Sequence, residues 1–211
     1  RLINRVVSKK RAEALAEESR HLPKIELSLD LAVDVENIAF GAFSPLEGFM
    51  VREEYESVLY SMRLPNDLPW TIPIVLDVSE TAAKSFKTGD DIALTFKGDL
   101  LAVMKVEDIY KCDKREYAKH VFKTLDADHP GVSKLMSLNE FFVGGELDLI
   151  GRVPNPFEKY TLRPIETRLL FKERGWRTIA GFQTRNAPHL GHEYAQKTAL
   201  AFVDGLFINP L

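Results

Sequence analysis

The stretch that decides the fold is Gly181-Phe-Gln-Thr-Arg-Asn-Ala-Pro-His-Leu-Gly-His192. It overlaps residues 178–182, which we interpret as a buried strand, and it precedes residues 193–203, which are typical of a helix. A strand, a polar loop and a helix N-terminus together hold anions well, because free backbone N–H groups and the helix dipole face the ligand. The sequence therefore predicts an anion site between residues 183 and 192.

The side chains of this loop suit the same purpose. Arg185 offers a charged fork that can hold an oxyanion through two parallel hydrogen bonds. His189 and His192 are three residues apart, so on a helix both rings reach the same ligand. A His-x-x-His pair alone is also typical of a surface feature or a metal site. Because no carboxylate or thiolate stands at the spacing of a zinc site, we predict no metal ligands.

The residues on either side extend this loop into a βαβ unit. Residues 205–210 are interpreted as a second buried strand, and residues 165–173 have helical spacing that Gly175 ends. The predicted order from residue 158 is helix, strand, loop, helix, strand, which is half of a doubly wound, Rossmann-like sheet. Ligands in such sheets lie beyond the carboxyl ends of the strands, where residues 183–192 would fall.

The first part of the chain has a mixed, strand-rich pattern. Pro154-Asn-Pro156 interrupts regular structure, so we predict domains at residues 1–157 and 158–211. The predicted helices cover residues 8–19, 30–39, 52–61 and 114–125. The predicted strands or extended segments cover residues 24–29, 72–78, 91–96, 100–110 and 144–152, with a tight turn at residues 97–99.

Composition narrows the class of protein. The chain has 211 residues, 45% hydrophobic and 28% charged, which suffices for one or two domains with a real core. A net charge of −3 without a basic tract argues against nucleic acid as a partner, and no apolar run is long enough to span a membrane. The single cysteine, Cys112, excludes an intrachain disulfide, as is typical of the cytoplasm; we interpret it as an incidental surface thiol.

Five segments of this sequence resemble one known family, the ATP sulfurylases (sulfate adenylyltransferases). The loop Gln-Thr-Arg-Asn-x-Pro-His-x-Gly-His is similar to the family signature, with Ala187 at a position that is often proline. Four further segments occur in the order and spacing of the family, at residues 41–50, 160–168, 175–176 and 203–211. The resemblance therefore spans most of the chain, from residue 41 to its last residue.

The resemblance implies an α/β protein in two parts. An N-terminal PUA-like mixed β-barrel domain would be followed by the first part of a Rossmann-like nucleotidyltransferase domain with the His-x-Gly-His signature. A later Gly-Arg-Asp motif of the family is absent, so we expect the catalytic domain to be incomplete and this chain alone to be inactive. The implied reaction joins MgATP and sulfate into adenosine 5′-phosphosulfate and pyrophosphate, by direct attack of sulfate on the α-phosphate. It serves assimilatory or dissimilatory sulfate activation.

The resemblance also assigns roles to the loop residues. Gln183 and Arg185 would bind sulfate, Thr184 and Asn186 would orient the loop, and the histidines would donate hydrogen bonds to the phosphates. The implied nucleotide-binding residues are Gln183, Thr184, Arg185, Asn186, His189, Gly191 and His192. The implied catalytic residues are Thr184, Arg185, Asn186, His189 and His192. Mg²⁺ would enter as MgATP.

Two other functions stay open at this point. A related nucleotidyltransferase with the His-x-Gly-His signature would transfer its nucleotide to another acceptor, although residues 183–186 supply an oxyanion grip that such enzymes do not need. PUA-like domains often bind RNA, but residues 1–157 lack an aromatic and basic platform. The resemblance favours a cytoplasmic homodimer without membrane or nucleic-acid partners.

Overall fold

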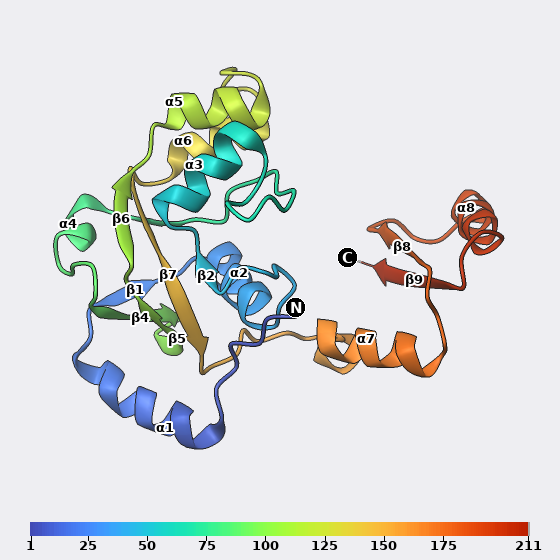
Figure 1. Cartoon of the computed structure of the whole chain (residues 1–211), viewed down its shortest axis with the longest axis horizontal. Coiled ribbons are helices and arrows are strands. Elements are labelled where there is room, and N and C mark those ends of the chain that lie inside the picture. Colours follow the sequence, from blue (N-terminus) through green and yellow to red (C-terminus); the bar gives the residue numbers. More distant parts are fainter. Residues whose placement is uncertain (211) are drawn as a thin grey trace. The chain divides into compact units, whose positions relative to one another are not determined.

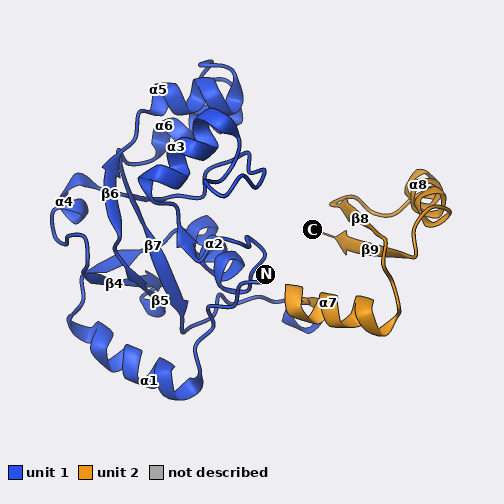
Figure 2. Cartoon of the chain, in the orientation of Figure 1, with its two compact units in different colours: residues 1–159 blue, residues 160–211 orange. Residues whose placement is uncertain are grey.

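The chain divides into two compact units. The computed structural model describes residues 1–210 and separates unit 1, residues 1–159, from unit 2, which begins at Tyr160 (Figure 2). Leu211, the last residue of the segment 203–211, lies outside the described residues. The separation falls two residues after the boundary expected at residue 157, and the domain limits themselves stay a prediction.

Unit 1 is built on a mixed sheet, as its strand-rich sequence predicts. Seven strands pair within the described residues, all antiparallel except β1 with β4 (Figure 1). The strands are β1 (Lys24–Glu26), β2 (Gly48–Phe49), β3 (Leu76–Val78), β4 (Asp91–Phe96), β5 (Asp99–Lys105), β6 (Asp108–Lys111) and β7 (Phe141–Leu149). The predicted turn between β4 and β5 is confirmed, with positive φ at Lys97 and Gly98.

Strand β7 organises this sheet, because it pairs with four other strands. Its first half pairs with β3 and β6, and its second half pairs with β2 and β5. Gly145, at the change of partners, has φ +149°, and a Cβ there would come within 1.9 Å of the Lys105 carbonyl oxygen. The glycine therefore lets β7 bend between two sets of partners, which curls the sheet.

The helices of unit 1 begin largely where the sequence predicts. Ser8 and Ser28 cap the first two by accepting hydrogen bonds from backbone N–H groups of Arg11 and Leu31. The helices are α1 (Lys9–Glu18), α2 (Leu29–Ala39), α3 (Arg52–Ser61), α4 (Glu80–Ala83), α5 (Lys114–Tyr117) and α6 (Pro130–Ser137). Short helical turns η1 (Ser19–His21) and η2 (Ala118–Phe122) adjoin them, and a third, η3 (Glu158–Tyr160), lies at the boundary of the two units in the sequence. No helix in residues 1–210 has the length and apolar composition needed to cross a membrane.

Three predicted strands are shorter than expected. The stretch 24–29 contributes only β1, because Ser28 already caps helix α2. The stretch 72–78 contributes only β3, because Pro73 has no N–H to give to a ladder. The stretch 100–110 is interrupted after Lys105, because Val106 donates its N–H to the Asp90 carbonyl, which lies outside the sheet pairing. The chain then resumes against β7 as β6.

Unit 1 has two hydrophobic clusters. One joins the sheet to α2 and includes Val35, Ile38 and Leu94. The other lies among α3, α5 and α6 and includes Tyr55, Tyr110 and Phe142. Each cluster consists largely of side chains with almost no exposure, so burial of apolar area stabilises unit 1.

Cys112 belongs to the second cluster, and its interpretation as a surface thiol is wrong. The side chain is 5% exposed, and its Sγ lies 3.5 Å from the Tyr55 hydroxyl. Burial raises the pKa of the Cys112 thiol, and the hydrogen bond with Tyr55 and the charge of Lys114 oppose this shift only in part. The run of charged neighbours in the sequence is misleading because Cys112 points inward while they point outward.

Unit 2 has the predicted order of elements. It comprises α7 (Pro164–Glu173), β8 (Ile179–Thr184), α8 (Leu190–Leu200) and β9 (Gly205–Pro210). The two strands are parallel and in register, with Ile179 opposite Gly205 and Thr184 opposite Pro210. The βαβ unit is therefore confirmed, although α8 begins three residues earlier than predicted.

Aromatic side chains pack α7 onto this strand pair. Phe171 of α7 stacks on Trp176 and meets Phe207 of β9 edge to face, with ring centroids 5.8 and 5.6 Å apart. Gly205 is required beneath Trp176, because a Cβ there would come within 2.2 Å of the indole ring. The prediction that both strands are buried is wrong for these residues: exposure alternates along β8, and β9 ends exposed. The reason is that β8 and β9 pair only with each other within residues 1–210.

Candidate active site

The loop between β8 and α8 has the geometry of an anion site. Its residues follow the carboxyl end of β8 and lead directly into the N-terminus of α8. Ligands of parallel sheets bind beyond the carboxyl ends of the strands. The first N–H groups of the following helix have no partner within the helix, so they are available to a ligand there. The predicted anion-binding residues are thus placed between a strand end and a helix start.

Thr184 fixes the first turn of the loop. Its Oγ1 accepts a hydrogen bond from the Asn186 N–H at 3.1 Å, and Oγ1 lies 3.4 Å from the Asn186 carbonyl oxygen. A Thr side chain bonded two residues ahead stabilises a turn at little entropic cost. This contact agrees with the expected orienting role of Thr184 and Asn186, which stays a prediction. The side chains of Gln183 and Arg185 are exposed.

His189 caps helix α8 with its imidazole ring. Its Nδ1 accepts a hydrogen bond from the Gly191 N–H at 3.1 Å. A ring nitrogen that accepts an N–H bond carries no proton, so the proton of this ring is on Nε2. The cap therefore leaves the His189 Nε2–H free to donate to an anion. Gly191 permits this geometry, because a Cβ at that position would lie 2.9 Å from His189 Cε1.

The two histidines lie face to face. Their ring centroids are 3.9 Å apart with an interplanar angle of 27°, as their spacing of three residues predicts. Phe182 of β8 meets the His192 ring edge to face at 5.7 Å. The His192 Nδ1 is buried without a hydrogen-bond partner in the described part of the chain. The rings thus form one packed pair, with His192 held between Phe182 and His189.

Two supporting residues are not evident from the loop motif. Phe182 stands directly before the motif and holds His192, although its place in the strand alone indicates only packing. Asp204, at the other end of the strand pair, accepts hydrogen bonds from the N–H groups of Arg177 and Thr178 at 2.8 Å each. These bonds lower the pKa of Asp204, and the carboxylate ties the start of β8 to the start of β9. The sequence signal that can identify Asp204 is an Asp followed by a Gly at the start of a strand.

Family models match both parts of the chain. A PUA-like domain model matches residues 1–152, and an ATP-sulfurylase model matches residues 158–211. Among solved structures, this chain is similar to the hexameric APS kinase from Thiobacillus denitrificans, with a TM-score of 0.77 and 27% identity. That match covers 99% of this chain and 38% of the other. The chain thus joins a PUA-like domain to the beginning of an α/β domain of the ATP-sulfurylase type.

Curated relatives identify the family more closely. The sulfate adenylyltransferase of Hyperthermus butylicus is 61% identical over 211 residues, which are 100% of this chain and 54% of the relative. Those of Staphylothermus marinus and Thermococcus onnurineus are 56% and 55% identical over all of this chain, which covers 55% of each. The chain belongs to the ATP sulfurylase family and spans about half the length of these relatives.

Proposed function

We propose that the full-length protein is a sulfate adenylyltransferase that uses the loop 183–192 to bring sulfate and MgATP together. The observation that carries the proposal is the His189 cap, which leaves the His189 Nε2–H available to donate to an anion at the start of α8. The family and its sulfate adenylyltransferase relatives support the choice of substrates. A cytoplasmic homodimer, as the resemblance implies, belongs to the same proposal.

The reaction needs positioning more than acid–base catalysis. Sulfate is already an anion at neutral pH, so an oxygen of sulfate attacks the α-phosphorus without a general base. The new O–P bond forms as the bond from the α-phosphorus to the bridging oxygen of the β-phosphate breaks. The electron pair leaves with pyrophosphate. The main obstacle is repulsion between two anions, which fixed hydrogen-bond donors and cations reduce.

Each loop residue has a place in this scheme. Arg185 binds sulfate with two parallel hydrogen bonds, and Gln183 adds an amide donor. His189 and His192 donate to oxygens of the α- and β-phosphates as negative charge develops on the leaving group. Mg²⁺ arrives with ATP as part of the substrate, because residues 183–192 include none of the carboxylates that Mg²⁺ prefers.

The test measures pyrophosphate release by the full-length protein from MgATP, with and without sulfate. We expect release that depends on sulfate, and rapid AMP formation when molybdate replaces sulfate, because the molybdate adduct hydrolyses. Release that responds to neither oxyanion contradicts the sulfate assignment. It leaves a related nucleotidyltransferase with another acceptor as the function of the site.

Substitution of Arg185 tests the two-bond grip. Arg185→Ala is expected to lower kcat by a factor of about 10²–10³, by loss of a donor that is stronger in the transition state. Arg185→Lys is expected to remain about tenfold or more impaired, because an ammonium cannot donate two parallel bonds. Arg177→Lys, at the opposite end of β8, is the matched control and keeps full activity. Wild-type turnover in Arg185→Lys contradicts the proposed grip.

A further inference from the structure

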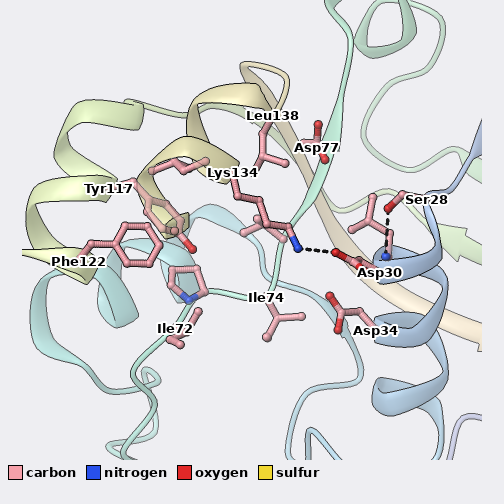
Figure 3. Close-up of a pocket in the computed structure, with 15 residues that line it drawn as sticks. Ser28, Asp30, Asp34, Ile72, Ile74, Asp77, Tyr117, Phe122, Lys134 and Leu138 are labelled. Atoms are coloured by element: carbon pink, nitrogen blue, oxygen red, sulfur yellow. Dashed lines mark hydrogen bonds and ion pairs between the residues drawn. The ribbon is translucent and has the colours of Figure 1, made fainter. Parts of the chain in front are cut away.

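A separate pocket of about 300 Å³ lies entirely within unit 1. Its walls come from α2, from the segment 72–77 and from the helical region of α5, η2 and α6. Figure 3 shows Tyr117 and Phe122 on one side of the pocket and Asp30 and Asp34 on the other. A volume of this size is at the lower end of the range for small-molecule sites.

The pocket walls are mainly apolar. Leu31, Ile74 and Leu135 line it together with the ring of Phe122, and each of these side chains also packs against a hydrophobic cluster of unit 1. Because the same side chains are anchored in the clusters, the pocket is preformed rather than made by ligand binding. Such walls bind an apolar body by excluding water from it.

Among the charged groups of the pocket, one carboxylate has neither an ion pair nor a hydrogen bond within the described residues. Lys134 of α6 is bonded to Asp30 of α2. Asp77 of β3 accepts hydrogen bonds from the backbone N–H and the side-chain amide of Asn139, both at 2.8 Å. Asp34 forms neither a hydrogen bond nor an ion pair within residues 1–210, and burial is the main influence on its carboxyl group. A ligand with a positive charge would supply the missing partner.

The hydroxyl of a largely buried tyrosine gives a second indication of a ligand. Tyr117 is only 6% exposed and lines the pocket, and its hydroxyl has no hydrogen-bond partner in the part of the chain that the structure describes. Burial raises the pKa of Tyr117 to about 12, so the hydroxyl stays protonated at neutral pH. The hydroxyl oxygen is not among the fully buried polar atoms, so it remains accessible and can hydrogen-bond to a ligand in the pocket.

We propose that this pocket binds a small organic amine whose ammonium group pairs with Asp34, whose apolar body lies between Ile74 and Phe122, and whose far end hydrogen-bonds to Tyr117. The negative excess follows from three carboxylates, Asp30, Asp34 and Asp77, against the single lysine of the lining. The walls exclude a fully hydrated inorganic cation as the best occupant, because they offer apolar contact and few oxygen ligands. This site is distinct from the loop 183–192 and does not depend on the proposed function.

Four probes of similar size separate the contributions of the ammonium group and of the phenolic hydroxyl to binding. Tyramine carries both the ammonium and a phenolic hydroxyl, phenethylamine lacks the hydroxyl, tyrosol replaces the ammonium with a neutral alcohol, and 4-hydroxyphenylacetate replaces it with a carboxylate. Binding to the full-length protein is followed by saturation-transfer NMR, and each Kd is obtained by titration. We expect tyramine to bind best, phenethylamine and tyrosol more weakly, and 4-hydroxyphenylacetate least.

Variants then assign each end of the ligand. Asp34→Asn is expected to weaken tyramine about tenfold, to the level of tyrosol, and to leave tyrosol unchanged. Tyr117→Phe is expected to weaken tyramine and tyrosol but not phenethylamine. Asp91→Asn, which removes one carboxylate from the exposed start of β4, is the control and leaves every Kd unchanged. A Kd for tyramine that Asp34→Asn does not change overturns the proposal, as does absence of saturable binding by both amines.

The pH dependence of tyramine binding provides an independent check of the ion pair with Asp34. The groups that face Asp34 are Asp30 on its own helix, Lys134 on α6, Asp77 on β3 and Tyr117 on α5. Among them, Asp34 is the group that titrates near pH 6. Tyramine affinity is therefore expected to fall by about tenfold in total as the pH drops from 7 to 4, because protonation removes the same charge that Asp34→Asn removes, while tyrosol affinity stays constant. Equal pH dependence of the two probes contradicts an ion pair with Asp34.

Discussion

Asp34 shows how one side chain affects both binding and stability. Burial raises the pKa of its carboxyl from 3.8 to about 6, and the neighbouring Asp30 raises it further than Lys134 lowers it. In the unfolded chain the carboxyl titrates near 3.8, so between pH 4 and pH 6 the folded state binds more protons. Ionised Asp34 therefore opposes folding, and this penalty is complete above pH 6 and absent below pH 4.

Asp34→Asn is accordingly expected to stabilise the full-length protein by about 1 kcal/mol at pH 7, a value reduced for the partial exposure of the side chain. Urea unfolding at pH 7 and at pH 4 measures the effect. The gain should disappear at pH 4, where the carboxyl is protonated in both states. Equal stabilisation at both pH values would mean that the substitution acts through packing rather than through the charge.

At the scale of single elements, the connection between β8 and β9 depends on Asp204. Its carboxylate accepts three hydrogen bonds, from the N–H groups of Arg177 and Thr178 and from the Thr178 hydroxyl. In return, the Thr178 carbonyl accepts the N–H groups of Asp204 and Gly205. These reciprocal bonds set the register in which both strands begin, and thus where the loop 183–192 begins at the other end.

Asp204→Asn is expected to loosen this junction. An amide oxygen accepts these bonds more weakly than a carboxylate, so the amides of residues 177–184 should exchange hydrogen faster in the full-length protein. Because the hydrogen bonds lower the pKa of Asp204, its contribution is present above about pH 4 and is lost as the pH falls below that value. Exchange measured by mass spectrometry should thus differ between wild type and variant at pH 7. Unchanged exchange would show that strand pairing alone holds the junction, and Thr178→Val separates the contribution of the hydroxyl.

The same scale shows what sequence patterns predict well. The starts of α1 and α2 are predicted within a residue because Ser8 and Ser28 are caps that act over three or four residues. The start of α8 is missed because the cap is His189, a residue type that caps few helices. The sequence does not predict strand limits that depend on residues far away in the chain. An example is β7, which bends at Gly145, where the backbone lies close to the Lys105 carbonyl oxygen. For the site, the sequence predicts the loop and its ends, but the packing of Phe182 on His192 depends on the folded geometry.

At the scale of the whole chain, the two units differ in how many buried apolar side chains they contain. Both hydrophobic clusters lie in residues 27–153, and neither α7 nor α8 has a buried residue within the described structure. Stability of a small domain depends mainly on buried apolar area, so the units should differ when separated. Val153 marks the C-terminal limit of the first core, because it is 7% exposed and its N–H donates to Glu36 Oε1 at 3.0 Å.

We therefore expect residues 1–159, produced alone, to fold and to melt in one cooperative transition, and residues 160–211 alone to show none. Circular dichroism with thermal melting measures both. A fragment of residues 1–152 should melt at lower temperature than residues 1–159, because it lacks Val153 and the Arg152–Glu158 ion pair. Cooperative melting of residues 160–211 alone would contradict the argument from burial, because it would require a core that α7, α8 and the β8–β9 pair do not form by themselves in residues 160–210.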